Sequence, residues 1–184
     1  GEIEAYYEKP DRPPCSNVSM GIYVFRRSVL IEWLDRNARY GRGRNLAIDV
    51  IPFMVGASRV LAYEHRGHWE YVGDVEAYFD AHQQLLNAER SVSLVEWEVM
   101  TNLKDRGLSD RPSAHVGSEA RVERALLSPG VIVEGTVRGS ALSPGCVVER
   151  GAVVEDCVLM HDTVVRAGAR LRRVVADKDV VFGE

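Results

Sequence analysis

The sequence predicts a partial α/β sheet of the Rossmann-like type followed by a parallel β-helix. Three observations support this fold class. Strand and helix patterns alternate in residues 1–90, a polar run interrupts them at 91–113, and an aliphatic or small residue recurs at every sixth position further on. A chain of 184 residues is long enough to form two small domains of this kind.

The first half alternates strand and helix candidates, which predicts a layered sheet. Short runs of apolar, β-branched and aromatic residues predict strands at 2–10, 20–25 and 59–65. Helical periodicity predicts a helix over 29–38 capped by Ser28, a second over 48–55, and a third that Asp74 caps. Three strands are few for a free-standing α/β domain, so we expect other strands to complete the sheet.

Residues 91–113 have the composition of a connector between domains. An amphipathic stretch around Trp97 precedes the polar run KDRGLSDRPS. Trp97 is expected to be a packing anchor, because tryptophan is usually well buried.

The second half, 114–184, changes period. Its aliphatic or small residues are spaced six apart, and the tetrapeptide LSPG occurs at 127–130 and again at 142–145; the spaced positions are Ala141, Val147, Val153, Leu159, Val165 and Leu171. Short internal repeats of this kind indicate a solenoid whose units bury their apolar face by stacking. Three six-residue units would close one triangular coil. An antiparallel sandwich would need turn signals every eight to twelve residues instead.

Composition excludes several classes of protein. The formal net charge is −4, which does not favour nucleic-acid binding. No apolar run approaches the roughly 20 residues needed to cross a bilayer, and we expect no secretory leader, no membrane partner and a cytoplasmic location. The three cysteines are too irregularly spaced for a zinc site, and Cys146 and Cys157 are expected to be buried thiols.

Four segments carry a resemblance to a known family: EKP at 8–10, SMGIYVF at 19–25, WEYVGDVEAYFDAH at 69–82, and LSPGCVVERGAVVEDCVLM at 142–160. In this order they resemble the glucose-1-phosphate adenylyltransferases, which are sugar nucleotidyltransferases with a C-terminal left-handed β-helix. DVIP at 49–52 and DKDV at 177–180 add weaker support. The resemblance implies that the chain is the C-terminal half of such an enzyme. Residues 1–90 would then be the sugar-phosphate side of the nucleotidyltransferase domain.

The resemblance also implies an activity and site residues. Such enzymes form ADP-glucose and pyrophosphate from ATP and glucose 1-phosphate in glycogen or starch synthesis, with Mg²⁺. Carried over, Glu8, Lys9 and Ser19 would bind the sugar phosphate. The family's glycine-rich nucleotide loop has no counterpart here, so the catalytic residues are unassigned and the isolated chain is expected to be inactive, with no cofactor of its own.

One position departs from the family pattern. Tyr71 stands where the resemblance predicts an aspartate that helps to hold magnesium. A neutral phenol is a poor magnesium ligand compared with a carboxylate, so no metal ligand is assigned in this chain. A non-catalytic, regulatory paralogue is therefore the first alternative.

Assembly and control are implied for the β-helix. Family members are typically tetramers that bind phosphorylated metabolite effectors, and a homo-oligomer is expected here. Cations that could contact an effector phosphate are Arg170, Arg172, Arg173 and Lys178. The competing interpretation of these cations is a solvated edge. A second alternative function is a hexapeptide-repeat acyltransferase, for which His161 would be the catalytic histidine.

Overall fold

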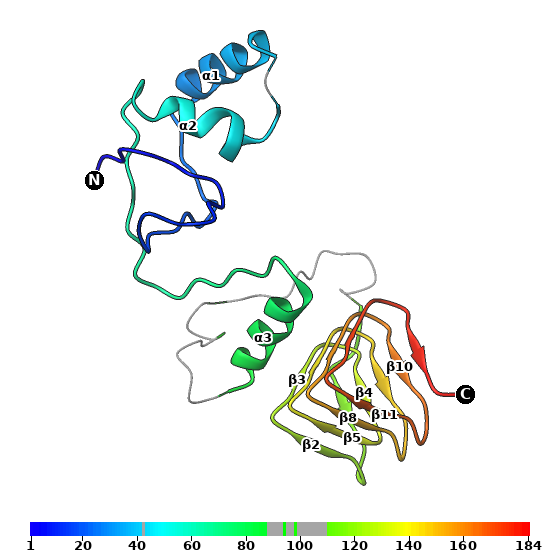
Figure 1. Ribbon diagram of the computed structural model, residues 1–184. Helices are drawn as coiled ribbons and strands as arrows, with labels where there is room; N and C mark the ends of the chain where they lie inside the picture. The colour runs from blue at the N-terminus through cyan, green and yellow to red at the C-terminus, as the bar shows by residue number, and fades with distance from the viewer. Residues whose placement is uncertain (42, 88–93, 95–97, 99–109) are drawn as a thin grey trace. The chain divides into compact units, whose positions relative to one another are not determined.

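A computed structural model describes residues 1–41, 43–87, 94, 98 and 110–184 (Figure 1). The chain forms two compact units, Gly1–Trp69 and Glu70–Glu184. The predicted packing role of Trp97 lies outside the described residues. Within the described parts, no helix is both long and apolar enough to cross a membrane.

The second unit contains a parallel β-helix of about four coils, as the sequence predicts. Each coil contributes one short strand to each of three sheets, ordered β1-β4-β7-β10-β13, β11-β8-β5-β2 and β12-β9-β6-β3. All strand pairs are parallel, and the strands are β1 His115–Val116, β2 Arg121–Glu123, β3 Leu126–Leu127, β4 Ile132–Val133, β5 Thr136–Arg138, β6 Ala141–Leu142, β7 Val147–Val148, β8 Val153–Glu155, β9 Val158–Leu159, β10 Val164–Val165, β11 Arg170–Arg172, β12 Val175–Ala176 and β13 Val181–Phe182.

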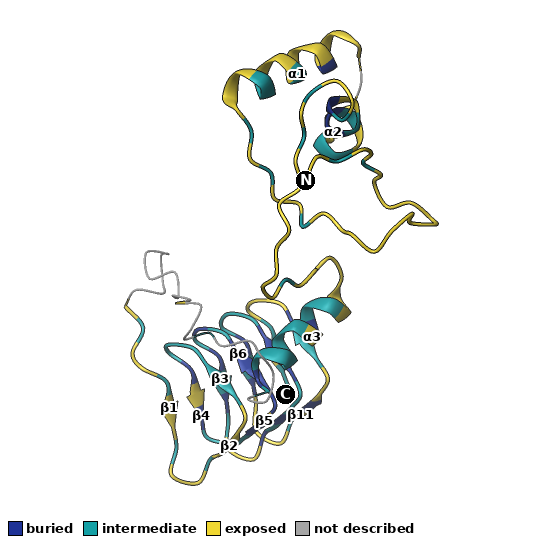
Figure 2. Ribbon diagram, turned by 90° about the vertical axis from the view of Figure 1, so that its left-hand side faces the viewer, coloured by how far each residue is buried: buried dark blue, intermediate teal, exposed yellow. Residues whose placement is uncertain are grey.

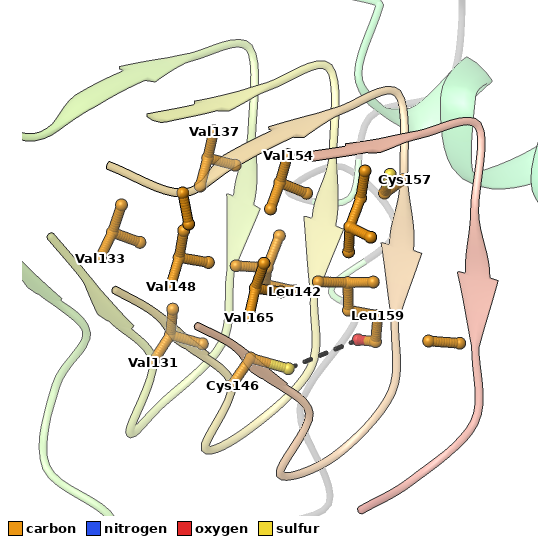
Figure 3. Close-up of a cluster of buried hydrophobic side chains, with 13 residues drawn as sticks. Val131, Val133, Val137, Leu142, Cys146, Val148, Val154, Cys157, Leu159 and Val165 are labelled. Carbon is orange, nitrogen blue, oxygen red and sulfur yellow. Dashed lines mark hydrogen bonds between the residues drawn. The ribbon is translucent and has the colours of Figure 1, made fainter. Parts of the chain in front are cut away.

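The interior of the β-helix follows a pattern different from the predicted strict period of six. Val148, Val154, Leu159 and Val165 all have 0% exposure, at intervals of six, five and six residues (Figure 3). Two of the positions predicted to point inward, at 147 and 153, are only half-buried, and their successors fill the core instead. A coil here closes in 17 residues, since Val148 pairs with Val165. The inward position therefore moves one residue earlier in one unit of each coil.

The two LSPG tetrapeptides occupy equivalent places in adjacent coils. Leu127 pairs with Leu142, so this part of the repeat gave the register directly. Both tetrapeptides end at a glycine with positive φ, 76° at Gly130 and 78° at Gly145. In this left-handed conformation a side chain costs roughly 1–2 kcal/mol, which explains the glycines at this corner.

Arg111 crosses these two glycines to reach the next coil. Its guanidinium donates two hydrogen bonds to Asp162, of 2.7 and 2.8 Å, and a Cβ added at Gly145 would collide with both side chains. The hydrogen bond from Arg111 is the largest influence on the Asp162 carboxyl and lowers its pKa. The pair thus fastens the segment before β1 to the third and fourth coils.

We expect Arg111→Ala to destabilise the β-helix by about 1 kcal/mol at pH 7, because the pair is bidentate but partly exposed. The carboxyl pKa is lower in the folded state, so this contribution is complete above the unfolded pKa, near 4, and is lost as pH falls through the folded pKa. The difference in melting temperature between wild type and variant should therefore shrink in acid. Arg150→Ala, which removes an exposed 3.6 Å pair with Glu119, is the control and should have little effect. A difference independent of pH would contradict the assignment.

Helix α3, Val75–Leu85, belongs to the same unit as the β-helix. Asp74 caps it as predicted, since its carboxylate accepts a 2.8 Å hydrogen bond from the Ala77 amide. The helix lies at the corner that follows β5 and β11: the Gln83 amide donates to the Gly139 carbonyl at 2.9 Å, and Arg173 lies 5.1 Å from the centre of the Phe79 ring. The predicted third helix therefore packs on the solenoid.

The first unit confirms two helical regions. Helix α1 spans Arg27–Arg39, and the π-helix η1, Leu46–Val50, continues into α2, Ile51–Met54. The predicted cap is wrong: the cap position of α1 is Arg26, which makes no side-chain cap, and Ser28 lies in the first turn. Asn45 caps η1 through its side-chain oxygen.

The three strands predicted in the first unit do not form. Only a bridge between Glu2 and Leu61 joins the first and third of these segments, and residues 20–25 have no strand partner in the described chain. Val24 is 97% exposed and Ile22 is 73% exposed, although both were expected to be buried. A strand is stabilised by ladder hydrogen bonds and same-face neighbours, so an apolar run without a partner strand remains extended and open.

The three cysteines should differ sharply in reactivity. Cys146 and Cys157 are fully buried, as predicted, whereas Cys15 is exposed. Burial raises the pKa of the Cys146 thiol to about 11 and also raises that of Cys157. A thiol-reactive dye at pH 8 should therefore modify one cysteine rapidly in the native chain and all three after denaturation. Rapid modification of more than one native thiol would contradict this packing.

Candidate functional site

Glu8 and Lys9 lie on the surface of the first unit, where the amino-terminal segment leaves its bridge to Leu61. The Ile3 amide donates to the Val60 carbonyl at 3.0 Å, which fixes the start of this segment. Lys9 has φ +45°, a left-handed conformation that is uncommon for a side-chain-bearing residue. Both side chains are exposed and accessible to a ligand.

A hydrogen-bonded cluster of two tyrosines joins the Glu8 segment to Ser19. The hydroxyl groups of Tyr6 and Tyr23 are 2.9 Å apart, and the Tyr23 hydroxyl is 3.1 Å from the Ser19 hydroxyl oxygen. Tyr6 also donates to the Glu8 carboxylate at 3.5 Å. The Ser19 oxygen in turn accepts from the Gly21 amide at 3.2 Å. Two of the three predicted substrate contacts are thus linked, and Lys9 is the chain neighbour of one of them.

Electrostatics keep this cluster neutral. Desolvation, followed by the hydrogen bond with Tyr23, raises the pKa of Tyr6 to about 12. At neutral pH the cluster therefore offers hydroxyl donors and acceptors beside the Glu8 carboxylate and the Lys9 ammonium group. Sugar hydroxyl groups and a phosphate are ligands that such a set can bind.

The sequence interpretation did not identify Tyr6 and Tyr23 as site residues. Both were treated as apolar strand residues. The available signal was their hydroxyl group, because a half-buried tyrosine needs a hydrogen-bond partner.

Tyr71 lies in the second unit and does not form part of a metal site. Its ring lies against the α-carbon of Gly73, where an added Cβ would collide with it. The neighbouring carboxylates are engaged elsewhere: Asp74 caps α3, and Glu70 accepts from Gln84 at 3.3 Å. No group of three histidine, cysteine or acidic side chains converges within the described residues. The residues present therefore do not fit a magnesium ion.

The four cations predicted to contact an effector lie around the last coil but have different surroundings. Arg170 and Arg172 point outward from β11 on either side of the inward-facing Leu171. Arg173 stacks on Phe79, and Lys178 lies in the turn before β13, where its amide donates to the Asp177 carboxylate at 2.8 Å. Only the first two share one face of a sheet.

Arg172 also lines a groove of about 360 Å³ across the β2, β5, β8 and β11 strands; its other lining residues are Glu123, Arg124, Arg138, Gly139, Glu155 and Asp156. Arg138 lies 3.7 Å from Glu123 and 3.1 Å from Glu155, and Arg124 lies 3.4 Å from Asp156. Three arginines thus face three carboxylates. The groove is nearly neutral, and Arg172 is its cation at the open end.

His161, the candidate of the acyltransferase alternative, lies in the turn between β9 and β10. Its Nδ1 atom is buried and has no hydrogen-bond partner within the described residues. The ring is therefore partly enclosed by the solenoid.

Comparison with known families matches both regions of the chain. Residues 1–88 match the nucleotidyl transferase family, and residues 112–184 match the family described as GlmU-like, C-terminal hexapeptide. The fold and these matches define a nucleotidyl transferase region followed by a hexapeptide-repeat β-helix.

Within that class, the chain belongs to the glucose-1-phosphate adenylyltransferase family. It is 31% identical to the glucose-1-phosphate adenylyltransferase of Bacillus cereus (strain Q1) over 98% of its own length and 48% of that relative. The enzyme of Bacillus anthracis is 30% identical over the same shares of the two chains. The chain thus spans about half the length of the curated relatives it matches.

Proposed function

We propose that this chain supplies the sugar-phosphate side of an enzyme that forms ADP-glucose and pyrophosphate from ATP and glucose 1-phosphate in glycogen or starch synthesis. The observation that supports this most is the Tyr6–Tyr23 hydrogen bond of 2.9 Å, which joins the segments of Glu8 and Ser19. The printed names of the relatives supply the reaction.

Each of the three residues has a role that suits its chemistry. The Glu8 carboxylate accepts hydrogen bonds from sugar hydroxyl groups, the Lys9 ammonium group neutralises the phosphate, and the Ser19 hydroxyl orients it. Transfer to the α-phosphorus of ATP needs positioned reactants and charge neutralisation more than covalent catalysis by the protein. Because the described residues do not fit Mg²⁺, no step is assigned to a metal in this chain.

Binding of glucose 1-phosphate tests this assignment directly. We expect Lys9→Ala to weaken the binding of glucose 1-phosphate by roughly 10-fold, as for loss of one charge-assisted hydrogen bond of about 1.5 kcal/mol. Titration calorimetry on the 184-residue chain measures it, and Lys104→Ala, which removes the other lysine on the amino-terminal side of the β-helix, is the control. Unchanged affinity in Lys9→Ala, or no binding by the wild type, would remove Lys9 from the proposed site.

The chain by itself should form negligible ADP-glucose, because it contains no nucleotide-binding glycine loop of the kind its resemblance implies. A coupled pyrophosphate assay with ATP, glucose 1-phosphate and magnesium measures this. The same assay on a protein extended to the length of the relatives separates the enzyme from the regulatory alternative: turnover supports the first, and sugar-phosphate binding without turnover supports the second. Turnover by the 184-residue chain alone would overturn the expectation.

We also propose that the β-helix serves assembly and regulation, with phosphorylated metabolites as effectors. Arg170 and Arg172 are the stronger candidates among the four cations, since they lie on one face of β11. Phosphate contact is the chemistry that such paired guanidinium groups favour.

A further inference from the structure

The three outer faces of the β-helix differ in what covers them. Side chains that point outward from the sheet β2-β5-β8-β11 are mostly charged, and they include the ladder of Glu123, Arg138, Glu155 and Arg172. On the sheet β3-β6-β9-β12, the outward residues Ala141 and Val158 are only 8% and 2% exposed. Two of the three faces are thus either solvated by charge or covered.

The third face is apolar and open. Its sheet, β1-β4-β7-β10-β13, presents one β-branched residue from each of four successive coils, in register; we call these residues the apolar stripe, Ile132, Val147, Val164 and Val181. Ile132 is 40% exposed and Val181 is 51% exposed, whereas the inward neighbours Val133 and Val165 are fully buried. Figure 2 shows β1 and β4 largely in the colour of exposed residues. No described part of the chain covers this stripe.

Charges beside the apolar stripe have opposite signs at adjacent coils. Glu149 follows β7 at the place where Arg166 follows β10, as the pairing of Val148 with Val165 requires. Arg166 is exposed, and the Glu149 carboxylate accepts a 2.9 Å hydrogen bond from the Ala167 amide without an ion pair among the described residues. The stripe therefore carries an acid on one side of its centre and a base on the other.

This arrangement is complementary to itself. When a second copy faces the stripe with its helix axis reversed, about a two-fold axis parallel to the strands and between β7 and β10, Val147 meets Val164 of the second copy. Glu149 then meets Arg166 of the second copy, and each contact occurs twice, as in any isologous interface. Ile132 and Val181 meet in the same way at the two ends. A reversed register that superposes β7 on itself would instead place two Glu149 carboxylates together.

We propose that the apolar stripe is a self-association surface through which two copies of this chain pack sheet face against sheet face with antiparallel helix axes. Five strands spaced about 4.8 Å apart cover a width of roughly 20 Å, so the contact is small. Interfaces of this size are weak, and a dissociation constant in the micromolar range or above is expected.

Sedimentation velocity on the full chain, from about 5 to 500 μM, tests the proposal. We expect the average sedimentation coefficient of the wild type to rise with concentration and that of Val164→Arg to stay constant. The matched control is Val153→Arg, which places the same charge at a half-buried outward position of the neighbouring charged face and should behave as the wild type does. Circular dichroism melting confirms that both variants fold, since neither residue points into the core.

A charge exchange tests the partner. Glu149→Arg should abolish the concentration dependence, because two arginines then meet, and the double variant Glu149→Arg/Arg166→Glu should restore it. A wild type that is monomeric over the whole range would overturn the proposal and favour a different partner protein. Association that persists unchanged in Val164→Arg, or a double variant that stays as defective as the single one, would overturn it as well.

Discussion

Leu159→Ala is expected to lower the free energy of unfolding of the β-helix by about 2–5 kcal/mol, which is the usual range for a buried leucine. The Leu159 side chain has 0% exposure and lies between Leu142 and Ala176, its partners in the neighbouring coils. The loss combines the transfer free energy of the removed methyl groups with the cavity that remains. Neighbouring coils cannot close this cavity easily, because their spacing is fixed by the strand ladder.

Chemical denaturation followed by circular dichroism measures this effect. Val181→Ala is the control, because this side chain is 51% exposed and points away from the core. Its expected change is below about 0.5 kcal/mol. Similar losses in the two variants would show that position 159 does not face the interior.

Gly135→Ala should be almost as damaging, by about 3 kcal/mol, although it adds only one methyl group. An added Cβ would lie 2.5 Å from the Ala152 carbonyl oxygen and 2.6 Å from the Glu149 carbonyl oxygen. Both atoms belong to the backbone of the next coil, so no side-chain rotation can relieve the collision. The corner is also short, since only residues 134–135 join β4 to β5, whereas 149–152 join β7 to β8.

Gly168→Ala is the informative comparison. Gly168 has φ +81°, but nothing lies within 4 Å of a Cβ added there. Its cost is therefore backbone strain alone, about 1 kcal/mol. Urea unfolding of both variants separates the two reasons for a glycine, and equal losses would mean that the close approach at Gly135 is relieved by movement of the backbone.

The β-helix could be predicted well because its stabilising contacts repeat along the chain. The LSPG tetrapeptides 15 residues apart gave the pairing of Leu127 with Leu142, and small residues at 146 and 157 correctly indicated buried thiols. The strict period of six was wrong at Val147 and Val153, since one unit of each coil is shorter. Periodicity reports the mean length of a unit, whereas the corner geometry sets each individual length.

Prediction was less successful in the first unit because strands depend on partners distant in sequence. The composition of 20–25 suits a buried strand, yet Val24 is 97% exposed. Helices α1 and α3 need only local hydrogen bonds, and both were predicted. Among site residues, Glu8, Lys9 and Ser19 remain predictions. Tyr6 and Tyr23 emerged only from the fold, because the contact between their hydroxyl groups joins residues 17 positions apart.

The sequence by itself determined the family, the order of the two regions and the stacking of the coils, because each depends on local motifs or on short repeats. Only the tertiary structure decided which outward side chains are covered, how Arg111 reaches Asp162 across two glycines, and that the apolar stripe is open. These features depend on the three-dimensional proximity of residues separated by many positions. Their physical basis is burial and distance, which no single segment of sequence contains.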